Sequence, residues 1–130
     1  MAKTFHCTVI TPERPVLERD ATFVAFPAFD GEMGVLPHRA PILAKLGAGE
    51  LRVESPEGDA AFFVNGGFAQ MVDDKLTLLT EEARLKTELD PAKAAADLAA
   101  ALALPAGNEA QAQARDKAVT RARALVRVAG

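Results

Sequence analysis

Apolar and polar residues alternate in short runs along the first two thirds of the chain. In residues 4–10, Phe5, Cys7 and Val9 share one face of an extended segment, and polar side chains dominate the other. Similar runs, separated by Pro, Gly, Asn and Asp, predict strands over 4–10, 22–26, 50–55, 61–65 and 75–80. Many short strands at this spacing favour a sandwich or flattened barrel over alternating strands and helices.

The last third of the chain has a helical pattern. Sixteen of its final 39 residues are alanine, the strongest helix former, whereas all seven phenylalanines lie at or before Phe68. Asp90 is placed to cap a first helix, "PAGN" at 105–108 ends it, and Asn108 is placed to cap a second helix that runs to about Val128. The pattern therefore predicts a helical hairpin. Its expected apolar stripes are Ala94, Ala95, Leu98, Ala101 and Leu102 on one helix, and Ala118, Ala122, Leu125 and Val126 on the other.

This hairpin should be weakly attached to the rest of the molecule. Alanine side chains bury little area, and burial contributes only about 25 cal/mol per Å² of apolar surface. The charges are also divided, because residues 1–108 hold 10 basic and 16 acidic residues, whereas residues 109–130 hold five basic and two acidic. A detachable basic arm with an acidic target is predicted. Its basic residues are Arg115, Lys117, Arg121, Arg123 and Arg127.

Composition excludes several classes of protein. A hydrophobic content of 49% and a net charge of -3 are typical of a globular domain, and they give no case for binding nucleic acid or a membrane surface. The start of the chain lacks the pattern of a secretory signal, and no window of about eighteen apolar residues predicts a membrane span. Cys7 is the only cysteine, which rules out an internal disulfide. We expect a cytosolic protein, or one that faces the cytosol on a larger assembly.

Candidate catalytic chemistry is sparse. The two histidines, His6 and His38, have no neighbouring nucleophile in the sequence, and no spacing resembles a metal site. The adjacent glycines of "VNGGF" fit a tight turn or bulge.

The helix pair offers one further hypothesis, in which Lys93 near Asp90 and the arginines of the second helix hold a nucleotide phosphate. The alternative is a solvated helix face with pairs such as Lys93–Asp97, and the residues alone leave both open.

Three motifs, in order, carry a family resemblance. "GEMGVLPHRAP", "VNGGFAQMVDDKLTLLTEEA" and "LDPAKA" resemble the epsilon subunits of bacterial F-type ATP synthases, and the resemblance covers nearly the whole chain. It implies a mainly β fold with α: an N-terminal ten-stranded β-sandwich over residues 1–88, followed by a C-terminal antiparallel α-helical hairpin over 89–130.

The resemblance also implies a function. Such a subunit is a non-catalytic rotor component of the central stalk in a proton-translocating complex, where it grips the gamma subunit and rests on the ring of c subunits. It couples ring rotation to the catalytic head. Its helices are compact in one state and extended along gamma in the other, where their basic side chains meet an acidic segment of the catalytic beta subunit and inhibit ATP hydrolysis. It lies on the cytoplasmic face of the bacterial inner membrane, as a peripheral part of the F1 sector without direct membrane insertion.

The unusual stretch at 30–43 matches the family's surface toward the c ring and stalk. Gly31 and Gly34 are expected to permit tight turns, and Pro37 and Pro41 to stiffen a loop. Arg39 stands where the family usually has histidine, with His38 one position earlier. The implied contact residues are Asp30, Gly31, Glu32, Gly34, Pro37, His38, Arg39 and Pro41.

The family's nucleotide-binding pattern is matched only in part. Lys93 replaces an arginine, Arg84 falls where nucleotide-binding members have an acid, and Leu125 replaces a later arginine. Because lysine lacks the planar fork of arginine, we expect at most weak ATP binding and no other cofactor or metal. The residues implied in this contact are Leu89, Asp90, Lys93, Ala94 and Arg121.

One alternative hypothesis has a different class of function. A stand-alone small-molecule-binding β-sandwich, with the helices as a lid, predicts a concave apolar pocket inside the sandwich. The rotor hypothesis predicts instead an exposed apolar strip on the sandwich, which is typical of a partner surface. An enzyme ranks third, because no acid–base constellation is present.

Overall fold

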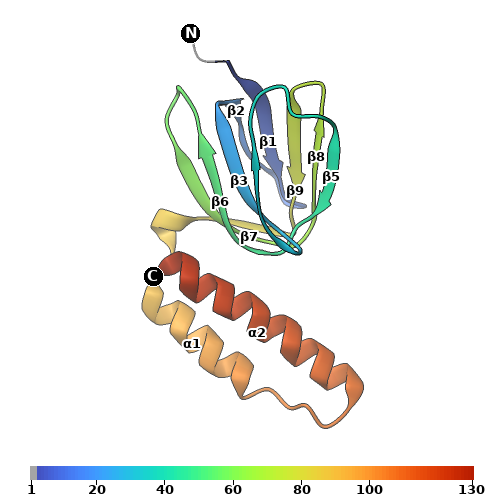
Figure 1. Ribbon diagram of the computed structural model, residues 1–130. Coiled ribbons are helices and arrows are strands. Elements are labelled where there is room, and N and C mark those ends of the chain that lie inside the picture. Colours follow the sequence, from blue (N-terminus) through green and yellow to red (C-terminus); the bar gives the residue numbers. More distant parts are fainter. Residues whose placement is uncertain (1–2) are drawn as a thin grey trace.

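A computed structural model describes residues 3–130 as a β-sandwich with a helical hairpin attached to one end (Figure 1). The fold class predicted above is confirmed, because ten strands form two five-stranded sheets and two helices follow them. The strands are β1 (Phe5–Ile10), β2 (Pro15–Ala21), β3 (Phe23–Ala28), β4 (Gly31–Val35), β5 (Ile42–Lys45), β6 (Ala48–Glu54), β7 (Ala60–Asn65), β8 (Phe68–Val72), β9 (Lys75–Leu79) and β10 (Glu82–Leu85). A short 3-10 turn, η1 (Lys86–Glu88), leads to the helices α1 (Pro91–Leu102) and α2 (Glu109–Ala129).

The two sheets have the strand orders β2-β1-β9-β8-β5 and β10-β7-β6-β3-β4. All of these pairs are antiparallel except β1 with β9, which run parallel from His6 opposite Lys75 to Ile10 opposite Leu79. Side chains alternate along each strand, so one set from each sheet faces the interior. The core between the sheets includes Phe5, Cys7, Val24, Phe26, Leu51, Val53, Met71, Leu76 and Leu78, each at most 1% exposed.

Both helices begin where the sequence predicts. The Asp90 carboxylate accepts a hydrogen bond from the Ala92 backbone amide at 2.9 Å, and the Asn108 side chain accepts one from Gln111 at 2.8 Å. The predicted apolar stripe of the first helix is only partly right, because Ala95 and Leu102 are exposed. The stripe that packs consists of Ala94, Leu98 and Ala101, which follow a narrower face than the one expected.

The stretch at 30–43, interpreted above as a loop, contains regular structure. β4 pairs with β3, and β5 pairs with β8, so only the turn before β4 and the residues between β4 and β5 are irregular. Gly34 therefore serves packing rather than a tight turn: a Cβ there would lie 3.0 Å from the Phe23 ring. Gly31 does adopt a left-handed backbone, with φ of 138°, as the turn prediction requires. Neither helix of the described chain is long and apolar enough to cross a membrane.

Candidate functional site

An apolar strip runs across the outer face of the sheet that contains β5, β8 and β9. It consists of Leu43, Phe68, Val72 and Leu79, whose side chains are 72%, 53%, 38% and 51% exposed. Phe68 lies directly opposite Leu79. Leu43 lies opposite Gln70, which is the residue between Phe68 and Val72 on the same face of β8. Contiguous apolar side chains on a monomer surface mark a site of interaction. We refer to these four residues as the apolar strip.

The interior of the sandwich is packed with side chains. In the described part of the chain, the one buried polar residue is Thr80, whose hydroxyl donates to backbone carbonyls, and no buried side-chain nitrogen or oxygen lacks a partner. A small-molecule pocket inside the sandwich would need an open volume lined mainly by apolar side chains, with a few polar groups for the ligand. The packed interior therefore gives no support to the alternative hypothesis of a ligand-binding sandwich.

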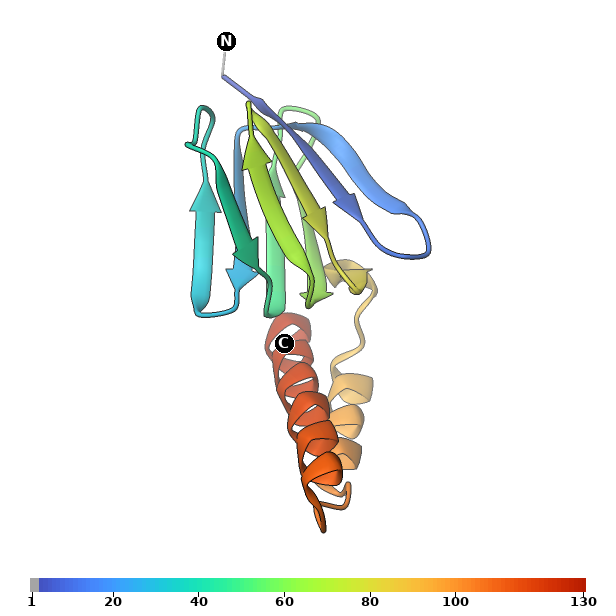
Figure 2. The ribbon, with the colours of Figure 1, turned by 90° about the vertical axis from the view of Figure 1, so that its right-hand side faces the viewer.

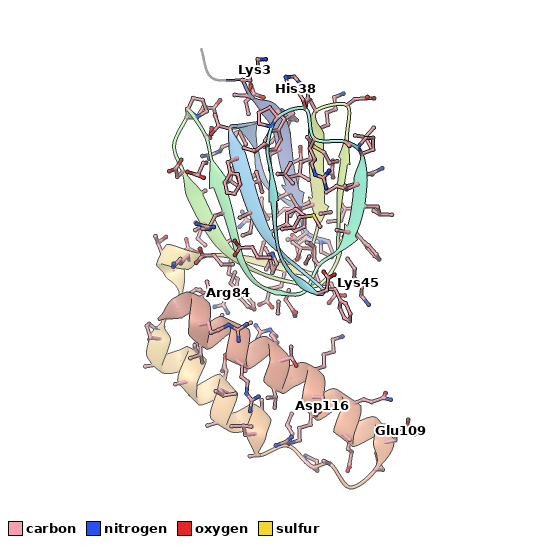
Figure 3. All side chains as sticks on the ribbon, viewed as in Figure 1. Lys3, His38, Lys45, Arg84, Glu109 and Asp116 are labelled. Carbon is pink, nitrogen blue, oxygen red and sulfur yellow. The ribbon has the colours of Figure 1, made fainter. Side chains whose placement is uncertain are left out.

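The predicted c-ring and stalk residues occupy the two ends of β4. Asp30 lies in the β3–β4 turn, and Gly31 and Glu32 begin β4 directly after it, at the end of the sandwich that carries the hairpin. At the opposite end, His38 donates its backbone amide to the Asp74 carboxylate at 2.6 Å, and its ring Nδ1 lies 2.9 Å from the other carboxylate oxygen. Figure 3 shows His38 far from the hairpin and Lys45 near it.

The predicted contact residues therefore do not form one cluster. Gly34, within β4, separates the turn from the residues of the second group, which lie at the end with His38: Pro37, His38, Arg39 and Pro41. At the turn itself, Phe29 is 73% exposed, and the Lys45 ammonium lies 5.0 Å from its ring centre.

The hairpin touches the sandwich mainly through the last turns of α2. Figure 2 shows the two helices projecting from one end of the sandwich, with the chain terminus closest to the strands. The contact buries the ring of Phe63, which points out of β7, beneath small side chains. These are Ala94, Ala124, Leu125 and Val128, with Ala48, Leu89, Val126 and Ala129 partly buried around them.

Arg121 connects α2 to the sandwich by a bidentate ion pair. Its Nε and one terminal nitrogen lie 2.8 and 2.7 Å from the two carboxylate oxygens of Glu82, on β10. The guanidinium also lies 5.7 Å from the Phe63 ring centre. Because the hydrogen bonds to Glu82 favour the charged form, they raise the pKa of Arg121.

The other four basic residues of α2 are free of such pairs. In the described chain, Arg121 is the one member of the group that has a carboxylate within 4.0 Å. Arg115 donates a 3.3 Å hydrogen bond to the Leu102 carbonyl oxygen, and Lys117, Arg123 and Arg127 are exposed. In this compact arrangement, Arg121 holds the arm against the sandwich. The other four basic side chains remain available to pair with acidic groups of a partner.

Four of the five predicted nucleotide residues come together. Leu89, Asp90, Lys93 and Ala94 line a hollow that Arg84, Asp97 and Leu125 complete, but its volume is about 10 Å³. Such a space holds roughly one water molecule. Arg121 lies outside it, engaged with Glu82. The hollow has no room for a nucleotide in this arrangement of the helices.

The described residues contain no group of three or more His, Cys, Asp or Glu side chains placed to hold a metal ion. Cys7 is buried in the core, and burial raises the pKa of its thiol to about 12. The apolar strip and the β3–β4 turn are candidate binding sites that the sequence predicted only in outline. The apolar strip could have been found from β8, where Phe68 and Val72 alternate with the buried Ala69 and Met71.

Comparisons with known proteins agree on one family. Residues 4–86 match the model of the ATP synthase delta/epsilon chain β-sandwich domain. The chain is 47% identical to the ATP synthase epsilon chain of Rhodopirellula baltica, over 95% of this chain and 97% of that one. It is 40% identical to the sodium-ion-specific epsilon chain of Propionigenium modestum, over 70% and 66% of the two chains.

A solved structure extends the likeness to the arrangement in space. The chain superimposes on a subunit of the mitochondrial ATP synthase of Euglena gracilis, in a structure of its OSCP, F1 and c-ring parts, with a TM-score of 0.84 and 26% identity. The match covers 94% of this chain and 79% of that subunit, so it includes helices as well as strands. On the strength of the family model and the 47% identical relative, the chain belongs to the ATP synthase delta/epsilon chain family.

Proposed function

We propose that this chain is a non-catalytic rotor subunit of a proton-translocating ATP synthase, that it couples rotation of the c ring to the catalytic head, and that its helical arm inhibits ATP hydrolysis. It works at the cytoplasmic face of the bacterial inner membrane as a peripheral part of the F1 sector. The observation that carries the proposal is the apolar strip on a sandwich whose interior is filled. A protein with these two features binds another protein rather than a small molecule.

The gamma subunit is the proposed partner of the apolar strip. One exposed ring and three exposed aliphatic side chains, close together on a sheet face, suit a long helix or a second sheet. Phe68→Lys, which places a charge on the strip, should weaken binding to purified gamma at least about tenfold. Leu104→Lys, at an exposed leucine beyond α1, is the matched control and should leave binding unchanged. Equal effects from both variants would argue against this assignment.

The β3–β4 turn is the proposed contact with the c ring. Asp30 is exposed, Glu32 makes only a 3.4 Å contact with Arg52, and both carboxylates are available to basic or polar loops of the ring. Charge reversal at both positions should weaken assembly onto the membrane sector and leave the fold intact. Circular dichroism checks the fold, and unchanged assembly and coupling would contradict the contact.

Inhibition requires the arm to leave the sandwich. The compact arm is held by small side chains around Phe63 and by the Arg121–Glu82 pair, so its release breaks few contacts. Once extended, Arg115, Lys117, Arg121, Arg123 and Arg127 would form a basic face for an acidic segment of the beta subunit. ATP is at most a weak ligand of the hairpin. Isothermal titration tests this point, and micromolar affinity would overturn it.

The deciding experiment measures ATP hydrolysis by the catalytic head with gamma. The full chain is compared with a chain that ends at Glu88 and with the full-length double variant Arg123→Gln/Arg127→Gln. The full chain should inhibit, the shortened chain should not, and the double variant should inhibit less. Lys3→Gln removes an exposed charge from the sandwich as the control. If every form binds and none inhibits, the subunit couples rotation without acting as a brake.

A further inference from the structure

A groove opens at one side of the sandwich, between β2 of one sheet and β7 and β10 of the other. Its volume is about 520 Å³, within the range of sites that hold ligands or short peptide segments. Its floor is formed by Leu17 and Phe62, which are 7% and 3% exposed. Leu85 lies at the rim and is 39% exposed. We refer to this feature as the seam groove. It is separate from the apolar strip and from the predicted c-ring residues.

Positive charge dominates the lining of the seam groove. Arg14 and Arg19 come from the β2 side and Arg84 from β10, against one acid, Glu88. In the described chain, no carboxylate lies within 4.0 Å of these three guanidinium groups. Arg19 donates one hydrogen bond to the Gly58 carbonyl oxygen at 2.9 Å, which fixes its place and leaves its other donors free. The body of the molecule is acidic overall, so this basic concentration is local.

The strands on either side of the groove are sheet edges. β2 pairs only with β1, and β10 pairs only with β7, so each has a row of backbone groups without a strand partner. An added extended segment could hydrogen-bond along such an edge while alternate side chains enter the groove. A simple anion would use the arginines but would leave the apolar floor and both edges without a role.

We infer that the seam groove binds an extended acidic polypeptide segment in which apolar residues alternate with Asp or Glu. The apolar side chains would cover Leu17 and Phe62, and the carboxylates would pair with Arg14, Arg19 and Arg84. Charge complementarity selects this occupant, because the groove combines three unpaired guanidinium groups with a buried apolar floor. A protein partner would supply this segment, which would add a strand at the edge of β2 or of β10.

The test uses the full-length protein and a fluorescein-labelled eight-residue peptide of alternating glutamate and valine. Fluorescence anisotropy measures the dissociation constant, and amide NMR shifts locate the contact. The expected result is saturable binding with amide shifts in residues 16–21 and in Glu82–Leu85. The double variant Arg14→Glu/Arg84→Glu should weaken binding at least about tenfold. Lys3→Glu, an exposed cation at the end of the sandwich near His38, controls for net charge and should have little effect (Figure 3).

Two further probes separate the proposed occupant from others. A peptide of alternating lysine and valine should not bind, and one of alternating glutamate and serine should bind more weakly than the valine peptide. The proposal is overturned if the valine peptide fails to bind, or if the double variant and Lys3→Glu weaken it equally. It is also overturned if sodium sulfate at equal ionic strength displaces the peptide and causes the same shifts. Circular dichroism confirms that each variant is folded.

Discussion

The guanidinium of Arg121 and the carboxylate of Glu82 are joined by two parallel hydrogen bonds across 39 positions of the chain. Glu82 lies on β10, the last strand before the hairpin, and Arg121 lies on the returning helix. The pair therefore closes a loop that contains η1, α1 and the turn between the helices. Its side chains are 30% and 26% exposed, so it is partly shielded from water and worth more than an ordinary surface pair.

Replacing Arg121 should loosen the hairpin. Arg121→Gln leaves the partly buried Glu82 carboxylate without its partner, at a cost of about 1–2 kcal/mol to hairpin docking. The undocked population should rise by a factor of about 5–30. Native-state hydrogen exchange of the α2 amides measures this change. A double-mutant cycle with Glu82→Gln should show coupling between the two positions.

The control for this prediction lies on the same helix. Arg123→Gln removes an exposed cation two positions away and should change α2 exchange by much less. Equal effects of Arg121→Gln and Arg123→Gln would show that general helix charge, and not the pair with Glu82, holds the hairpin.

Gly67 is required at the turn between β7 and β8. Its φ of 102° is strained for other residues, and a Cβ there would overlap the carbonyl oxygen of Leu79. Gly67→Ala should therefore destabilise the sandwich by at least about 2 kcal/mol, as seen by thermal or denaturant unfolding. Gly107→Ala, where the Cβ would meet only the flexible side chain of Gln111, should change stability by less than about 0.5 kcal/mol. A tolerated Gly67→Ala would contradict the close approach.

Cys7 should be unreactive in the folded protein. Burial raises the pKa of its thiol from 9.0 to about 12, so almost no thiolate exists near neutral pH. Alkylation by iodoacetamide should be slow until concentrated guanidinium chloride unfolds the chain. The unfolded thiol ionises at the lower pKa, so this residue's contribution to stability is complete below about pH 9 and falls as the pH rises toward 12. Rapid labelling of the native protein would contradict its burial.

His6 should stabilise the fold more in mild acid than in base. Its ring nitrogens lie 3.3 Å from Asp20 and 3.0 Å from Glu18, and these hydrogen bonds raise its pKa above 6.5. The folded state therefore holds the proton more tightly than the unfolded chain. The resulting stabilisation is complete below about pH 6.5 and disappears as the pH rises through the folded pKa.

Two measurements check the direction of this pH dependence. NMR titration of His6 should give a pKa above the ordinary value. The difference in melting temperature between the natural chain and His6→Gln should be larger near about pH 5.5, where both carboxylates are still ionised, than near about pH 8.5. A larger difference in melting temperature at the higher pH would contradict the predicted stabilisation by protonated His6.

The sequence predicted the inner strands better than the edges. β1, β6 and β9 were expected because their buried and exposed positions alternate clearly. Four of the strands not found by alternation, β2, β4, β5 and β10, are the edges of the two sheets, where contact with the core is incomplete. β8 was missed for a different reason: Phe68 and Val72 put apolar side chains on its outer face. The family resemblance supplied the correct number of strands.

The candidate site was predictable in part. Local motifs placed Asp90 and Asn108 as helix caps and Gly31 at a turn, since these depend only on neighbouring residues. The Arg121–Glu82 pair depends on how α2 packs back against β10. Neither the strand β10 nor this packing could be predicted from neighbouring residues in the sequence. The separation of Asp30 from His38 likewise follows from the unpredicted strand β4.

The parallel pairing of β1 with β9 also governs how the chain can fold during synthesis. The first strand cannot complete its sheet until Leu79 has left the ribosome, because β9 is the last strand of that sheet to be made. The helices, in contrast, form from local contacts as soon as they emerge. A ribosome-bound chain that is cut short before β9 should therefore expose the edge of β1 and aggregate, whereas one that stops after η1 already has every strand.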